Sequence, residues 1–198
     1  MSVPRLRRLL HRWLRRRRVG RAYDMAKEIA RQLSFGQRVL DVGCGTGYIA
    51  HLLAAFLGVP VQGTDVGPGP EAPIAFVPIA DCELPFAPGS FDVVLFCYVL
   101  HHAPSAETLV NAARKVLRPG GRIVIYEDTP RSWLDRLFCW RHQRRWIKRT
   151  GPCTFRSDAS WVSLFQGLDL QLLVRRRLSR LRDWSYPVAR SFYVLRAL

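Results

Sequence analysis

The sequence predicts an α/β fold in which a mostly parallel sheet is covered by helices on both faces. Two observations carry this prediction. Short apolar runs alternate with helical patterns along most of the chain, and a glycine-rich turn joins the first run to a helical pattern. Such alternation is typical of parallel sheets, because each crossover carries a helix across the sheet. In these sheets, ligands bind beyond the carboxyl ends of the strands.

The segment before the sheet contains two helical patterns. Residues 3–18 repeat apolar side chains at helical spacing, with arginines on the opposite face. The apolar positions are Leu6, Leu9, Leu10, Trp13 and Leu14. Gly20 is expected to interrupt this helix before a second one over residues 22–33. We therefore separate a basic amphipathic helix, residues 1–20, from a main domain, residues 21–198.

After the helix over residues 22–33, the main domain is predicted to contain seven strands and four further helices. The strands are residues 38–42, 61–66, 74–79, 91–98, 122–127, 168–177 and 191–196. The helices are residues 48–57, 106–117, 132–148 and 158–166. Only residues 66–73, which include three prolines, separate the second strand from the third. Because a parallel crossover usually needs about a dozen residues, this connection is expected to be a bare loop or a truncated helix.

The charge of the chain is strongly positive. The formal net charge is +16, the sequence pI is about 10.9, and arginine accounts for nearly all of the basic residues. A genome-wide preference for arginine explains part of this excess but not its clustering over residues 5–21, 131–149 and 175–182. Such clusters favour anionic partners: nucleic acid, an anionic membrane surface or an acidic substrate.

The cysteines indicate a reducing compartment, and we expect a cytoplasmic protein. Their number is odd, no CxxC pair occurs, and neither a disulfide framework nor a zinc site is expected. No apolar run of about 18 residues predicts a transmembrane helix. The N-terminus lacks the apolar core of a secretory signal, whereas its arginine-rich, acid-free composition leaves a mitochondrial transit peptide as an alternative.

A glycine loop follows the first predicted strand. Residues 41–47 read Asp-Val-Gly-Cys-Gly-Thr-Gly, which is a GxGxG spacing. Glycine lets the backbone turn sharply and approach a ligand closely. Pyrophosphate-binding loops usually read GxGxxG. Here the spacing is tighter, and Asp41 would repel a phosphate but attract a cationic ligand.

Residues 39–47 resemble motif I of class I S-adenosylmethionine-dependent methyltransferases, especially the small-molecule group that includes quinone-biosynthesis enzymes. Residues 61–65, 81–93 and 116–125 resemble later stretches of that family in the same order. The resemblance implies a Rossmann-like seven-stranded sheet whose last strand is antiparallel. It also implies S-adenosylmethionine as the cofactor, which carries an ammonium and a sulfonium but no phosphate.

The resemblance also implies roles for individual residues. Asp65 would accept hydrogen bonds from both ribose hydroxyls, or it merely caps a turn. Asp81 would accept from the adenine amino group, while the N–H of Cys82 would donate to a ring nitrogen. Asp92 is expected to be structural. The predicted cofactor-binding residues are Asp41, Gly43, Cys44, Gly45, Gly47, Asp65, Val66, Asp81, Cys82 and Tyr98.

Methyl transfer needs a general base only if the acceptor must lose a proton. The candidate bases at the carboxyl ends of strands are Tyr98, His101, His102, Glu127 and Asp128. His101 and His102 follow the fourth strand, and His102 is selected because histidine titrates in a useful range. The alternative is that one of these histidines starts the next helix and has a structural role. No metal ligand is predicted.

Residues 131–166 are expected to form a lid over the acceptor site. The first part of this segment is rich in arginine, tryptophan and leucine, as is typical of a membrane interface. The sequence therefore predicts a methyltransferase for a small, lipophilic acceptor at a membrane surface. RNA methylation is the alternative, since arginines and aromatic residues also bind RNA. A non-catalytic protein that binds S-adenosylmethionine is the third interpretation.

Overall fold

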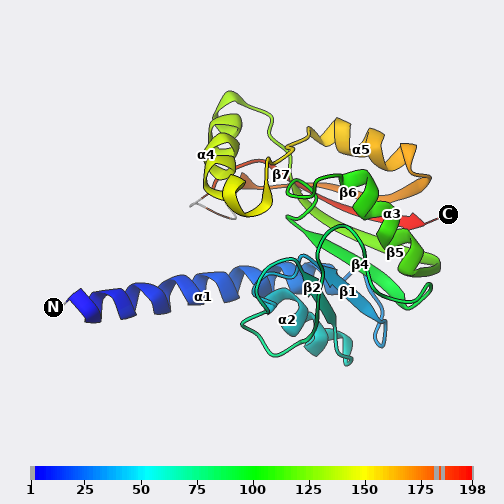
Figure 1. Ribbon diagram of the computed structural model, residues 1–198, viewed down its shortest axis with the longest axis horizontal. Coiled ribbons are helices and arrows are strands. Elements are labelled where there is room, and N and C mark those ends of the chain that lie inside the picture. Colours follow the sequence, from blue (N-terminus) through cyan, green and yellow to red (C-terminus); the bar gives the residue numbers. More distant parts are fainter. Residues whose placement is uncertain (1–2, 181–182, 184–185, 198) are drawn as a thin grey trace.

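The computed structural model describes residues 3–180, 183 and 186–197, apart from the side chains of residues 3–13, 15 and 149. Within this part of the chain one seven-stranded sheet forms, in the order β3-β2-β1-β4-β5-β7-β6 (Figure 1). The strands are β1 (Val39–Val42), β2 (Gln62–Asp65), β3 (Ala75–Pro78), β4 (Phe91–Cys97), β5 (Leu117–Asp128), β6 (Leu170–Leu178) and β7 (Arg190–Ala197). The helices are α1 (Val3–Ala30), α2 (Tyr48–Leu57), α3 (Ala106–Val116), α4 (Trp133–Thr150) and α5 (Asp158–Gly167).

The strand directions bring the candidate site residues to one edge of the sheet. Strands β1 to β5 pair in parallel, whereas β7 runs antiparallel to both β5 and β6. The predicted fold class is confirmed. Because parallel strands end at the same edge, Asp41, Asp65 and Tyr98 lie at or just after the carboxyl ends of β1, β2 and β4.

Two apolar layers hold the helices against the sheet. Helices α1 and α2 bury residues such as Ile29 and Leu53 against one face, while α3 and α5 bury residues such as Val110 and Trp161 against the other. Each of these four side chains is fully or almost fully buried. Burial of a large apolar side chain contributes roughly 1.5–3 kcal/mol, so both layers stabilise the sheet substantially.

Helix α1 runs without a break through Gly20, so the predicted interruption there is wrong. A glycine inside a helix costs only about 1 kcal/mol relative to alanine, and Met25, Ala26 and Ile29 anchor the following turns in the core. The N-terminal part of α1 extends away from the sheet (Figure 1). The apolar face predicted at Leu6, Leu9, Leu10 and Trp13 lies outside the described side chains.

The connection between β2 and β3 is a bare loop without a helix, which decides between the two forms that the sequence left open. The N–H groups of Glu71 and Ala72 both donate to the carbonyl of Thr46, at 3.1 and 3.0 Å. The short connection is thus tied to the glycine loop.

Two local expectations fail at the end of β4 and the start of β5. Helix α3 begins at Ala106, and the hydroxyl of Ser105 caps it by accepting from the N–H of Thr108, so neither histidine starts this helix. Residues 117–121 belong to β5 rather than to a turn, because Leu117 pairs with Phe91 before an irregularity in the ladder. No helix in the described part of the chain is long and apolar enough to span a bilayer.

Candidate functional site

The glycine loop between β1 and α2 is a preformed turn. Gly43, Gly45 and Gly47 have φ angles of 69°, 52° and 75°, in the left-handed region that L side chains disfavour. The N–H groups of Gly43 and Cys44 donate to the carbonyl of Thr64, at 2.8 and 3.1 Å. These bonds tie the loop to β2.

The loop is packed at its two ends and open in the middle. A Cβ on Gly43 would lie 2.4 Å from Val99 Cγ2, and one on Gly47 would lie 2.8 Å from Pro70 Cβ. A Cβ on Gly45 would meet no described atom within 4 Å. A ligand can therefore approach the backbone at Gly45.

Asp41 ends β1 as a buried carboxylate. Only 1% of the residue is exposed, and neither side-chain oxygen has a hydrogen-bond partner among the described residues. Burial, followed by the nearby charge of Asp65, raises the pKa of Asp41 from 3.8 to about 7. Because buried polar groups are nearly always paired, this carboxylate beside an open glycine turn indicates a ligand that brings positive charge and hydrogen-bond donors.

Asp65 supports the loop from the end of β2. One carboxylate oxygen accepts from the N–H of Gly45 at 2.8 Å, and the other accepts from the N–H of Gly67 at 2.7 Å. Asp65 does cap the turn, as the sequence allowed. Each carboxylate oxygen has a second lone pair, so Asp65 can also accept from ligand hydroxyls.

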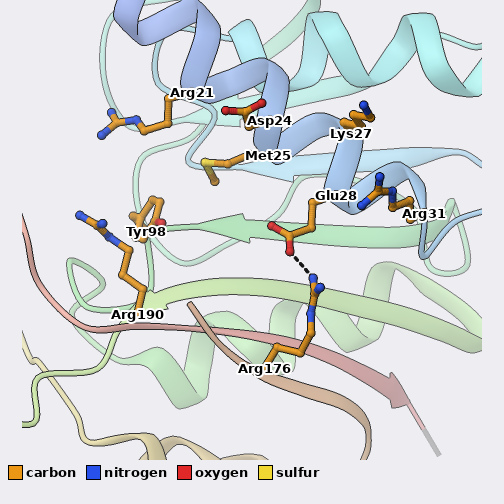
Figure 2. Close-up of a pocket in the computed structure, with 9 residues that line it drawn as sticks. All are labelled: Arg21, Asp24, Met25, Lys27, Glu28, Arg31, Tyr98, Arg176 and Arg190. Atoms are coloured by element: carbon orange, nitrogen blue, oxygen red, sulfur yellow. Dashed lines mark hydrogen bonds and ion pairs between the residues drawn. The ribbon is translucent and has the colours of Figure 1, made fainter. Parts of the chain in front are cut away.

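A cavity of about 330 Å³ lies between α1 and the sheet, beside Tyr98 (Figure 2). Tyr98 directly follows β4 with a left-handed φ of 63°, and strained residues of this kind often belong to functional sites. The cavity is lined by five basic residues and two acidic ones, and its net charge is positive. The lining residues are Arg21, Asp24, Met25, Lys27, Glu28, Arg31, Tyr98, Arg176 and Arg190.

Residues 40–125 match the family described as Methyltransferase domain. This part of the chain therefore resembles a methyltransferase domain. The match covers β1 to β5 and therefore includes the glycine loop, Asp65 and Tyr98. The family resemblance predicted from the sequence is confirmed.

Two curated relatives and one solved structure illustrate the similarity. The methyltransferase GfsG of Streptomyces halstedii is 34% identical over 116 residues, which cover 52% of this chain and 42% of that protein. The ubiquinone biosynthesis O-methyltransferase of Idiomarina loihiensis is 32% identical over 133 residues, covering 58% and 53%. The chain thus spans about half the length of these relatives. A SAM-dependent methyltransferase from Methanosarcina mazei shares the fold with a TM-score of 0.65 and 20% identity, over 86% of this chain and 96% of that one.

The match to a methyltransferase family implies S-adenosylmethionine as the cofactor, in agreement with the sequence prediction. The residues present fit it, since the unpartnered Asp41 carboxylate suits its ammonium group and the open backbone at Gly45 leaves room for close approach. When bound, S-adenosylmethionine supplies a methyl group that its sulfonium charge has already activated.

The other predicted cofactor residues differ in burial and in their contacts. The Cys44 thiol packs towards Gly63, where an added Cβ would meet its Sγ at 2.9 Å, and burial raises its pKa to about 12. Only the backbone of Cys44 therefore suits the cofactor. Val66 and Asp81 are exposed, whereas Cys82 is buried with its Sγ 3.9 Å from the carbonyl of Ser105. No hydrogen bond joins Asp81 to the glycine loop among the described residues.

A histidine cluster lies beyond the end of β4. His102 is half-buried, with its Nε2 3.1 Å from His142 Nε2 and its Nδ1 3.0 Å from Thr150 Oγ1. Burial and the neighbouring His101 and His142 lower the pKa of His102 to about 3. The imidazole is therefore uncharged at neutral pH, and at that pKa it is a weak general base. Its catalytic role stays a prediction.

Two further residues belong to this cluster, Glu127 and His142, and the sequence analysis missed His142. Glu127 is fully buried, accepts from the N–H of Leu100 at 2.7 Å and holds His101 Nδ1 at 2.6 Å. His142 comes from α4 and contacts His102 across forty residues of chain. Glu127 was a visible candidate because it ends a strand, whereas no local pattern distinguished His142 from the surrounding basic residues.

Proposed function

We propose that this chain transfers the methyl group of S-adenosylmethionine to a small, lipophilic acceptor. The observation that carries the proposal is the buried, unpartnered carboxylate of Asp41 at the start of the open glycine loop. An isolated buried carboxylate is costly unless a ligand pairs with it. The ammonium group of the cofactor has the required charge and donors.

In this proposal the residues of the chain bind and orient the cofactor and the acceptor, and they exclude water from the site. Asp41 holds the ammonium group, and Asp65 holds the ribose hydroxyls while it fixes the loop through Gly45. Val66, Asp81 and the N–H of Cys82 hold the adenine. Because the methyl donor is already activated, positioning of the two reactants supplies most of the catalysis.

The cavity beside Tyr98 is our candidate for the polar end of the acceptor. Figure 2 shows Tyr98 and Arg190 on the side of the cavity opposite α1, with Arg21 and Met25 across from them. Excess positive charge on its walls favours an acceptor that carries a carboxylate, phosphate or acidic hydroxyl. The curated relative named for ubiquinone biosynthesis agrees with a small acceptor of this kind.

Helix α4 presents a surface that suits a membrane interface. Trp133, Leu137, Trp140 and Ile147 are 77%, 44%, 52% and 45% exposed, and their spacing places them along one stripe of the helix. The basic residues beside this stripe are Arg141, Arg144, Arg145 and Lys148. Exposed tryptophans flanked by basic residues favour the lipid boundary, so we propose that α4 rests on an anionic membrane that delivers the acceptor.

Calorimetric titration with S-adenosylmethionine tests the cofactor site. We expect the Asp65→Ala and Asp81→Ala variants each to bind about tenfold more weakly or worse, because each loses hydrogen bonds to the nucleoside. Asp169→Asn is the matched control, since Asp169 is exposed and precedes β6 at the opposite edge of the sheet. Undiminished affinity in both site variants would mean that the nucleoside lies elsewhere. No binding by the native chain would favour a scaffold protein that kept the fold.

Liposome co-sedimentation tests the membrane interface. The native chain should sediment with anionic vesicles more than with neutral ones, and the variant Trp133→Ser/Trp140→Ser should lose most of that binding. The control is Lys115→Ser on α3, which removes an exposed charge remote from α4. Equal recovery with both kinds of vesicle would contradict the membrane interface. Salt-dependent retention of tRNA would favour the RNA alternative.

A further inference from the structure

Three imidazoles meet between the end of β4 and helix α4. One nitrogen from each of His101, His102 and His142 lies within 4.8 Å of the corresponding nitrogens of the other two. Within this group, Nε2 of His102 and Nε2 of His142 are 3.1 Å apart.

The outward-facing nitrogens of two of these rings already have partners. Nδ1 of His101 lies 2.6 Å from a carboxylate oxygen of Glu127. Nδ1 of His102 lies 3.0 Å from the hydroxyl of Thr150 and 3.3 Å from the Sγ of Cys153. Histidines that bind metals usually hold a carboxylate, carbonyl or water with the second nitrogen, which fixes the ring so that the first nitrogen faces the ion. This arrangement leaves Nε2 of His101 and Nε2 of His102 available to bind an ion.

Nε2 of His101 is the atom that hydrogen bonding leaves unexplained. The residue is 1% exposed, and this nitrogen has no partner among the described residues. A hydrogen bond between two neutral imidazoles accounts for the contact between His102 and His142. It does not supply a partner for His101, whereas an ion bound by all three rings does.

We propose that His101, His102 and His142 bind a divalent transition-metal ion of the zinc type, which fastens α4 to the end of β4. Imidazole nitrogens suit zinc, and three protein ligands leave one position for water or an acceptor oxygen. With zinc–nitrogen distances of about 2.0–2.1 Å, tetrahedral ligands lie about 3.3 Å apart, close to the observed 3.1 Å pair. The third ring moves inward when the ion binds. The proposal goes beyond methyl transfer, because metal binding is measured without cofactor or acceptor.

The first test measures zinc retention by the untagged full chain after removal of metal with a chelator. The native chain should retain one zinc ion per chain after dialysis, and His142→Gln should bind zinc about 100-fold more weakly or worse. The control is His51→Gln, which changes an exposed histidine on α2 and should keep full retention. Equal retention by the native chain and His142→Gln would overturn the proposal.

The second test uses cobalt as a spectroscopic probe and keeps a ligand at position 142. The variant His142→Cys should still bind cobalt and should gain a near-ultraviolet thiolate-to-cobalt band that the native chain lacks. Zinc should also raise the melting temperature of the native chain but not that of His142→Gln, whose fold is checked by circular dichroism. Cobalt binding by His142→Cys without the new band would show that position 142 holds no metal, and the proposal would fail.

Discussion

The glycine loop and the histidine cluster lie at the same edge of the sheet but are assembled in different ways. Residues 41–47 are contiguous, and their turn is fixed by glycine geometry and by bonds to the adjacent strand β2. The histidine cluster joins two residues after β4 to one residue of α4, forty residues later. A contiguous turn with left-handed glycines leaves a pattern in the sequence, whereas a contact between distant elements leaves none.

The strongest test of the glycine loop compares two alanine substitutions. In Gly43→Ala, the new Cβ combines left-handed strain with overlap on Val99, so we expect a loss of about 3–5 kcal/mol in the free energy of unfolding. Gly45→Ala has the same strain in open space and should lose only about 1–2 kcal/mol. Urea unfolding of both variants measures the difference. Equal midpoints would show that packing at Gly43 does not distinguish the two positions.

The next test concerns the anchoring of α4, on which the histidine cluster depends. Asp135 is fully buried and accepts from the N–H groups of Arg131, Ser132 and Ala189. We expect Asp135→Ala to cost about 3 kcal/mol, because three backbone donors, including the buried N–H of Ala189, lose their acceptor. Hydrogen exchange should show α4 opening while β1 and β4 stay protected.

The stabilising effect of Asp135 should also depend on pH. Its backbone hydrogen bonds keep the pKa of the folded carboxyl below its ordinary value of 3.8. The stabilisation is therefore present above the unfolded pKa and is lost as the pH falls through the folded pKa. The stability difference between the native chain and Asp135→Ala should shrink in strong acid. A difference that stayed constant would contradict this origin.

The Asp41→Asn variant links the stability of the loop to ligand binding. The folded pKa of Asp41, about 7, lies above its ordinary value of 3.8. Without ligand, the contribution of Asp41 is therefore most favourable below pH 4 and is lost as the pH rises through 7. At about 1.4 kcal/mol per pKa unit, the total change is up to about 4 kcal/mol, and Asp41→Asn should remove most of this pH dependence.

The affinity for the cofactor should change with pH in the direction opposite to the stability of the ligand-free chain. The affinity of the native chain for S-adenosylmethionine should rise between pH 6 and pH 8, because the ionised carboxylate binds the ammonium group. Asp41→Asn should bind about tenfold to 100-fold more weakly at pH 8, with little dependence on pH. Calorimetry in buffers with different ionisation enthalpies measures the released proton. A binding heat that did not depend on the buffer would remove Asp41 from the site.

The smallest effect is expected at Gly20, inside α1. Gly20→Ala should stabilise the helix by about 0.5–1 kcal/mol, because an added Cβ would meet no described atom within 4 Å. Gly20→Pro should instead cost about 3 kcal/mol in helix stability. Far-ultraviolet circular dichroism during thermal unfolding measures both. Insensitivity to proline would mean that the helix already ends there in solution.

The sequence predicted the sheet and the glycine loop well because both rest on local patterns. Short apolar runs marked all seven strands, and helix α2 was predicted with its observed bounds, Tyr48–Leu57, since Gly47 and Gly58 frame it. The prediction of a helix break at Gly20 is wrong because tertiary contacts of the following turns outweigh the modest cost of one glycine. The predicted start of β5 is wrong because pairing with β4 keeps residues in the strand that would otherwise form a turn.

In the candidate site too, local sequence patterns predicted some features and long-range packing determined the others. The sequence could single out Asp41 and Asp65 as candidates because each is the second-last residue of a predicted strand, and the backbone directions of a parallel sheet bring such residues together. The partners of those residues were not foreseen. That Asp65 already holds Gly45, and that Val99 packs against Gly43, depends on side-chain packing between separate strands.

Local chemistry along the chain was thus sufficient for the α/β fold and for the turn between β1 and α2, and it led to the prediction of a cationic ligand beside Asp41. Folding in three dimensions fixed the burial of that carboxylate, the basic cavity beside Tyr98, and the meeting of His142 with His101 and His102. The physical reason is the distance along the sequence over which each effect acts. Backbone geometry and hydrophobic periodicity act over a few residues, whereas burial and convergence of side chains depend on how distant elements pack.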